Sequence, residues 1–152
     1  MRVAESLEVS APPEVVWKVI SDPTRYLHFL SGFTRWEVVS DEPGGCGARY
    51  KMLMRVGSAE IGGLIEVVEW VPNREIAWTS ITGIDQRGRW ILRDCHPETE
   101  ATLRVSYQVP GVVLALVSSQ FGRPLLRRDL RRSLEALREA VRHGPIDEAA
   151  AA

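Results

Sequence analysis

The start of the chain constrains the fold most, because it places one strand and two short helices ahead of every other element. Residues 3–9 alternate apolar and polar side chains, which is typical of a half-buried strand. Pro12-Pro13 suits a first helical turn, where missing N–H groups are tolerated. Asp22-Pro23 is a helix-start pattern with the aspartate as N-cap. We therefore predict a strand, a short amphipathic helix, and a second helix that ends near Gly32.

Short turns separate a series of strand-like segments in the middle of the chain. The turns are marked by Asp41-Glu42-Pro43-Gly44-Gly45, by Pro72-Asn73 and by His96-Pro97-Glu98. Successive strands joined in this way predict an antiparallel meander. Gly62-Gly63 interrupts the longest segment and predicts a bulge or a sharp bend. The predicted strands cover residues 34–40, 48–56, 59–71, 74–81, 87–95 and 101–109.

A long helix is predicted at the end of the chain. Residues 112–121 are almost wholly apolar, and Gly122 and Pro124 are expected to break or kink the helix. Residues 125–141 are amphipathic, with apolar side chains recurring every three or four positions and arginines between them. We expect the tail 144–152 to be disordered, which leaves a single domain over residues 1–143.

Composition excludes several classes of protein. A chain of 152 residues favours one domain with a real core, and its net charge of −1 gives no global field that would recruit nucleic acid. No apolar run reaches transmembrane length and no signal peptide is apparent, so we expect a cytoplasmic protein without stable membrane insertion. Cys46 and Cys95 lie far apart, so a disulfide is not indicated and a metal site lacks ligands.

Four groups of residues share a known pattern. They are residues 11–17 (Ala-Pro-Pro-Glu-Val-Val-Trp) with Asp22-Pro23 downstream, Gly47-Ala48-Arg49-Tyr50, residues 66–74 across a hairpin, and Thr102-Leu103. In these, the chain resembles the polyketide cyclase/dehydrase and START-related lipid-binding superfamily. The resemblance implies an α+β helix-grip fold, in which a curved seven-stranded antiparallel sheet and two short helices wrap around a long C-terminal helix. It also implies an apolar pocket between sheet and helix for a lipid-, quinone- or polyketide-like molecule.

The residues that would line such a pocket come from two regions. The apolar faces of the predicted strands carry the aromatic and thioether side chains of Trp36, Tyr50, Met52, Met54, Trp78, Trp90 and Tyr107. Leu116, Gln120 and Phe121 in the apolar segment before Gly122 are predicted to form its floor or gate. The strand residues could instead form an ordinary core, and the apolar segment is equally compatible with a buried helix that has a structural kink. Tyr26, His28, Phe29 and Leu30 on the second helix are expected to border the entrance.

Catalytic residues are not identified by the sequence. Acid–base catalysis needs a titratable group held near the substrate, and no serine–histidine–aspartate order, phosphate-binding glycine loop or metal spacing surrounds the histidines. His28 is better explained as a rim or surface residue than as a base. The resemblance implies that a cyclase would use an arginine or tyrosine to polarise a carbonyl, for which the candidates are Arg49, Tyr50, Arg89 and Tyr107. Glu66, Arg89 and Asp94 are equally explained as solvent-facing. No cofactor is predicted.

Three functions therefore remain open. The first is a carrier or sensor that binds a hydrophobic small molecule in an internal cavity. The second is a polyketide cyclase or dehydrase acting in the same cavity, and the third is a protein-interaction module that uses the groove. The arginines between Arg123 and Arg142 would suit an anionic membrane or an acidic partner, although a solvated face is the commoner explanation. A homodimer is left open.

Overall fold

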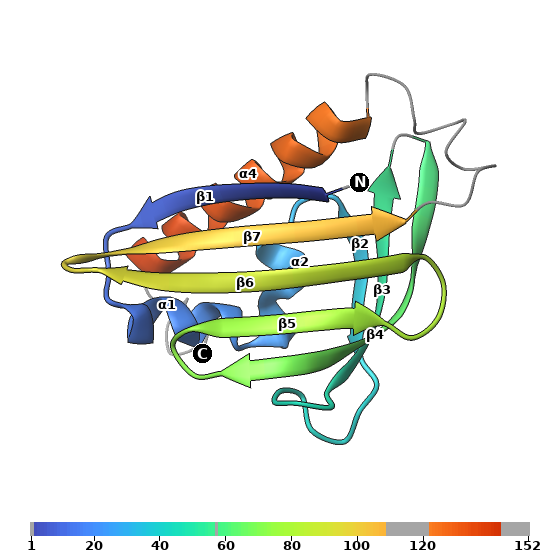
Figure 1. Ribbon diagram of the computed structural model, residues 1–152, viewed down its shortest axis with the longest axis horizontal. Helices are drawn as coiled ribbons and strands as arrows, with labels where there is room; N and C mark the ends of the chain where they lie inside the picture. The colour runs from blue at the N-terminus through green and yellow to red at the C-terminus, as the bar shows by residue number, and fades with distance from the viewer. Residues whose placement is uncertain (1, 57, 109–121, 144–152) are drawn as a thin grey trace, which may run out of the picture.

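A seven-stranded antiparallel sheet forms one wall of the molecule, with the strand order β1-β7-β6-β5-β4-β3-β2 (Figure 1). The structure is a computed structural model that describes residues 2–56, 58–108 and 122–143. The predicted helix over 112–121 and the predicted tail 144–152 lie outside the described residues. The strands are β1 Arg2–Val9, β2 Phe33–Val38, β3 Arg49–Val56, β4 Ala59–Val71, β5 Glu75–Ser80, β6 Asp85–Cys95 and β7 Glu98–Gln108.

The described helices lie against the concave face of this sheet (Figure 1). The short helix α1 (Pro13–Ile20) begins at the paired prolines, and Asp22 caps the 3-10 turn η1 (Pro23–Arg25) by accepting a hydrogen bond from the backbone N–H of Thr24. The helix α2 covers only Tyr26–Phe29. The long helix α4 (Gly122–Arg142) crosses the β1 and β7 side of the sheet. The second predicted helix is therefore two shorter pieces.

Alternation along the strands divides the sheet into a buried face and an outer face. In β6 and β7 every second side chain is buried, from Gln86 to Leu92 and from Thr99 to Tyr107. The buried positions face leucines of α4 that recur at helical spacing, namely Leu126, Leu130, Leu134 and Leu137. Burial of these side chains, at about 25 cal/mol per Å² of apolar surface, provides the main force that holds helix and sheet together.

The sheet bends along β4, whose first part pairs with β3 and whose last part pairs with β5 (Figure 1). A Cβ at Gly62 would lie 2.0 Å from the carbonyl oxygen of Met52, and one at Gly63 would lie 2.1 Å from the carbonyl oxygen of Thr82. Only glycine allows the backbones to approach this closely. The register shift between β4 and β5 lies further along the strand, between Val67 and Glu69, so the β-bulge is at Val68. The two glycines instead mark the place where neighbouring backbones approach β4 closely.

One turn follows the predicted chemistry, and two strands begin earlier than expected. Asn73 adopts a φ of 65° in the Pro72-Asn73 turn, a conformation that asparagine tolerates. The strand β6 begins at Asp85 and not near residue 87, and β7 begins at Glu98 and not near residue 101. The polar residues at these ends pair across strands, for example Asp85 with Gln108 and Cys95 with Glu98. Backbone pairing between β6 and β7 thus continues past the residues whose apolar–polar alternation predicted these strands.

Candidate functional site

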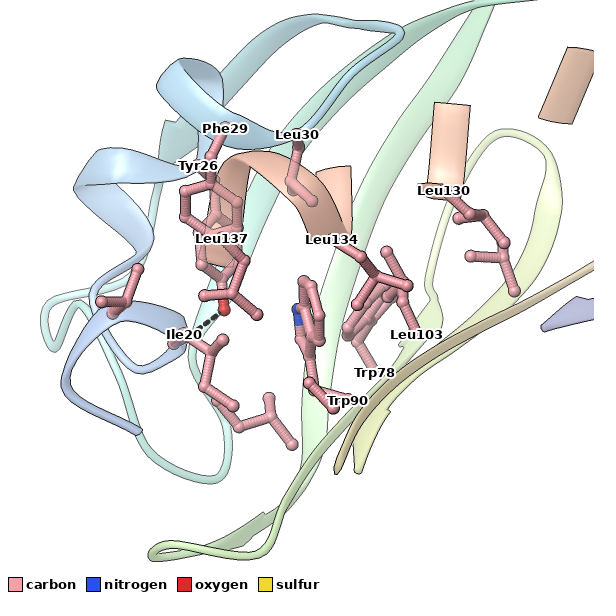
Figure 2. Close-up of a cluster of buried hydrophobic side chains, with 14 of the residues drawn as sticks. Ile20, Tyr26, Phe29, Leu30, Trp78, Trp90, Leu103, Leu130, Leu134 and Leu137 are labelled. Carbon is pink, nitrogen blue, oxygen red and sulfur yellow. Dashed lines mark hydrogen bonds between the residues drawn. The ribbon is translucent and has the colours of Figure 1, made fainter. Parts of the chain in front are cut away.

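The aromatic and thioether side chains predicted to line a pocket lie together in the core under the sheet. All seven are less than a tenth exposed, and Met52 and Trp90 are fully enclosed. They come from β2, β3, β5, β6 and β7, so they are distributed across the width of the concave face. Figure 2 shows Leu134 and Leu137 of α4 facing the indoles of Trp78 and Trp90. Whether these side chains contact a ligand remains a prediction.

The aromatic rings gather at the α2 end of this core. Trp36 lies at the centre of the group, with ring centroids 4.8 Å from Tyr26, 5.1 Å from Tyr50 and 5.6 Å from Phe33. Tyr26 is buried and donates its hydroxyl hydrogen bond to the carbonyl of Ile20, which ties α2 to α1 (Figure 2). These ring contacts fix the position of α2 against β2 and β3.

Several polar groups point into this apolar core. Gln86 is 3% exposed, and its amide nitrogen donates to the sulfur of Met52 at 2.9 Å. The hydroxyl of Tyr107 donates to the sulfur of Met54 at 2.8 Å. A thioether is a weak hydrogen-bond acceptor. The indole N–H groups of Trp36 and Trp90 are buried and have no hydrogen-bond partner among the described residues. The core therefore holds donors that oxygen acceptors would satisfy better than sulfur does.

Burial raises the pKa of all three tyrosines in the chain. The pKa of Tyr50 rises to about 12 because burial disfavours the charged phenolate. Burial raises the pKa of Tyr26 well above its ordinary value, with Tyr50 and Asp22 adding to the effect. The pKa of Tyr107 is raised by burial and then by the nearby carboxylate of Asp129. Each phenol is therefore neutral at physiological pH and acts as a hydrogen-bond donor or acceptor.

A small cavity remains between the sheet, the loop after α2 and the first turns of α4. Its volume is ≈ 10 Å³, which is about the space of one water molecule. This interior cavity is mostly apolar, but Ser31 and Asp129 border it, and the Ser31 hydroxyl donates to Asp129 Oδ1 at 3.1 Å. The full lining is Leu30, Ser31, Phe33, Met54, Trp78, Leu103, Val105, Tyr107, Leu126, Asp129 and Leu130.

The other predicted residues fall into two groups. Leu116, Gln120 and Phe121 lie outside the described residues. Polar candidates on the strands lie away from the core: Arg49 pairs with Glu66, Arg89 pairs with Glu69 and Glu75, and Asp94 accepts a hydrogen bond from the backbone of His96. Of the four cyclase candidates, only Tyr50 and Tyr107 face the interior. At the expected entrance, Leu30 lines the cavity whereas His28 is exposed.

Sequence reasoning did not single out three polar residues of the site. Gln86 lies just before the predicted start of its strand. Every second residue from Gln86 to Leu92 is buried, so extending this alternation backward from Gly88 would have predicted a buried side chain at residue 86. Asp129 and Ser133 lie on α4, where Ser133 accepts a hydrogen bond from the backbone N–H of Ser31 at 2.8 Å. Ser133 lies among the leucines on the buried face of the helix, so the helical spacing of these leucines could have predicted that Ser133 is buried.

No group of three or more His, Cys, Asp or Glu side chains among the described residues could hold a metal ion. Cys46 and Cys95 are free thiols. None of the described helices is long and apolar enough to cross a membrane.

The curved sheet, the two short helices and the long final helix define a helix-grip protein. Residues 1–142 match the family described as "Polyketide cyclase / dehydrase and lipid transport", and the chain belongs to this family. A comparison with curated proteins finds no significant match.

Solved structures of low sequence identity share the fold. A protein of Thermus thermophilus superposes with a TM-score of 0.80 at 20% identity, over 94% of this chain and 98% of the other. The Zhui aromatase/cyclase of a Streptomyces species gives 0.69 at 18% identity, over 94% of each chain. A START superfamily protein of Mycobacterium smegmatis gives 0.70 at 16% identity, over 93% of this chain and 97% of the other.

Proposed function

We propose that this protein binds a hydrophobic small molecule bearing oxygen atoms in the core between the sheet and α4. The observation that carries the proposal is the set of buried donors among apolar side chains. Gln86 donates to a thioether, and in the part of the chain that the structure describes the indole N–H of Trp90 has no hydrogen-bond partner. Concave sites for small molecules are typically apolar with a few placed polar groups. Membership of a family that includes lipid transport agrees with this function.

The size of the interior cavity sets a condition on binding. At ≈ 10 Å³ the cavity is far smaller than the roughly 300–1,000 Å³ of a typical small-molecule site. A ligand therefore has to displace side chains, and Met52 and Met54 are suited to this because unbranched thioethers repack easily. A protein-interaction module would instead keep the core closed, so the two functions predict different results with small apolar probes.

Binding is tested with a matched pair of aromatic probes, naphthalene and 2-naphthol, together with native mass spectrometry of the protein as purified. Both probes should bind, and 2-naphthol should bind more tightly because its oxygen can accept from a buried donor. Gln86→Leu should reduce the preference for 2-naphthol by up to roughly tenfold, the worth of one hydrogen bond. Binding of neither probe, with no co-purifying molecule, contradicts the carrier function and favours the interaction module.

A second candidate function is catalysis by a cyclase or dehydrase. The observation in its favour is that Tyr107 and Asp129 border the same cavity, so that a phenol and a carboxylate are both available to a bound carbonyl compound. Turnover of a poly-β-ketone thioester should then be lost in Tyr107→Phe and in Asp129→Asn, while 2-naphthol still binds. Binding without product formation, under conditions where a known cyclase acts, excludes this candidate.

A further inference from the structure

The outer face of the sheet carries a hollow that the function proposed above does not use. The arginine hollow, as we call it, has a volume of ≈ 530 Å³ and contains Arg2 of β1, Arg87 and Arg89 of β6, and Arg104 of β7, and none of the described residues that line it is acidic. Strand register explains the clustering. Arg87 and Arg2 both pair with Ser106, and Arg89 pairs with Arg104 in the next row.

The charge of this hollow is only partly compensated. Arg89 forms ion pairs with Glu69, at 2.8 Å, and with Glu75. Among the described residues, Arg2, Arg87 and Arg104 form no ion pair with a carboxylate. Arg89 and Arg104 are directly opposite each other on neighbouring strands, an arrangement in which like charges repel. A bound anion would remove this repulsion.

An apolar floor lies beside the arginines. The bulge in β4 turns Val68 outward, where it is 49% exposed, and Ala77 of β5 is buried beneath the hollow. The hydroxyls of Thr79 and Ser106 also border the space. The hollow thus has a cationic side on β6, β7 and β1 and an apolar side on β4 and β5. Its volume is within the range of small-molecule sites.

We propose that the arginine hollow is a second binding site, for a soluble organic phosphate. Guanidinium groups offer paired N–H donors that match the oxygens of a phosphate, which a lysine ammonium does not. The phosphate would contact Arg87, Arg104 and Arg2, and the apolar part of the molecule would lie over Val68 and Ala77. The site lies on the opposite side of the sheet from the interior cavity, so it does not depend on the proposed interior function.

The test is calorimetric titration with phenyl phosphate and with inorganic pyrophosphate at physiological salt concentration. Both probes should bind, and the amide resonances of Ala77, Gly88 and Ser106 should shift on binding. The double variant Arg87→Gln/Arg104→Gln should weaken binding at least roughly tenfold, because two charge-assisted contacts are lost. Binding of 2-naphthol in the core should not change in this variant, which separates the two sites.

The matched control is the double variant Arg55→Gln/Arg93→Gln. Arg93 lies on β6 and pairs with Glu100, and Arg55 lies on β3. Neither residue lines the hollow. The control removes two positive charges, as the test variant does, so the two variants have the same net charge. Equal loss of binding in the control and in the test variant would mean a diffuse charge effect and would overturn the proposal. It is also overturned if neither phosphate probe binds, or if only vesicles containing phosphatidic acid bind.

Discussion

The side-chain amide of Gln86 on β6 donates a hydrogen bond to the sulfur of Met52 on β3, across the concave face of the sheet. Both side chains are enclosed, and two strands separate them in the sheet order. The contact therefore depends on the curvature of the sheet, which brings β6 and β3 toward each other over the core. It places a polar amide where the surrounding residues offer mainly carbon and sulfur.

Replacing Gln86 by leucine should not reduce stability. The substitution removes a buried amide whose nitrogen donates its hydrogen bond to a weak acceptor. The free energy of unfolding should therefore stay unchanged or rise by about 1 kcal/mol. Urea denaturation followed by tryptophan fluorescence measures this difference. A loss of more than about 2 kcal/mol would show that the amide is well satisfied in the core.

Gly88→Ala should be destabilising because Trp78 occupies the space of the missing side chain. A Cβ at Gly88 would lie 2.0 Å from Cζ2 of Trp78, whose indole is buried. Overpacking of this kind typically costs about 1–3 kcal/mol. In a double-mutant cycle, the same substitution in a Trp78→Leu background should cost much less. Equal costs in the two backgrounds would exclude this contact as the cause.

Stability should fall as the pH rises above 10. In the folded state burial raises the pKa of Tyr50 to about 12, and the pKa values of Tyr26 and Tyr107 are also raised. An unfolded chain loses the phenol protons near pH 10, whereas the folded chain keeps them. Stability is thus fully present below pH 10 and, for Tyr50, is lost between pH 10 and about 12.

Two measurements check this pH dependence. Tyrosinate absorbance should be nearly absent from the folded protein at pH 10.5 and should appear on unfolding by urea, since ~10 is the ordinary tyrosine pKa. Tyr50→Phe should flatten the decline in the free energy of unfolding above pH 10. A folded protein whose tyrosines titrate near their ordinary value would contradict the burial argument.

Ser133→Ala should weaken the attachment of α4 to the loop after α2. The Ser133 oxygen accepts from the backbone N–H of Ser31 at 2.8 Å and donates to the carbonyl of Asp129 at 2.8 Å. Removing it leaves a partly buried N–H without this acceptor, at a cost of about 1–2 kcal/mol. Thermal denaturation compares this variant with Glu135→Ala, an exposed position on the same helix that should change stability little. Alanine raises the intrinsic helix propensity at both positions, so a loss confined to Ser133→Ala would come from the lost hydrogen bonds, and equal stability of the two variants would contradict this role of Ser133.

The elements of the fold could be predicted because each has a local cause. Alternation defined the strands, and Pro12-Pro13 and Asp22-Pro23 marked where helix and turn begin. The split of the second predicted helix into a 3-10 turn and a single helical turn was not predictable in this way. It depends on tertiary contacts of Tyr26 with Trp36 and with the carbonyl of Ile20.

The polar residues of the site are harder to predict because their roles depend on register between distant strands. Arg87, Arg89 and Arg104 appear in the sequence as part of a general arginine excess. Only pairing of β6 with β7 and of β7 with β1 brings them together with Arg2. In the same way, nothing near Gln86 in the sequence indicates Met52, which lies 34 residues earlier.

Trp78 borders both the interior cavity and the arginine hollow, because the sheet between these spaces is a single layer and Gly88 adds no side chain to it. This position has an optical consequence. The indole of Trp78 is buried in the core, so its emission, isolated by subtracting the spectrum of Trp78→Phe, reports on the interior side of the sheet. A hydrophobic quencher that enters the core should reduce this emission, whereas iodide bound among the arginines on the other side of the sheet should reduce it little.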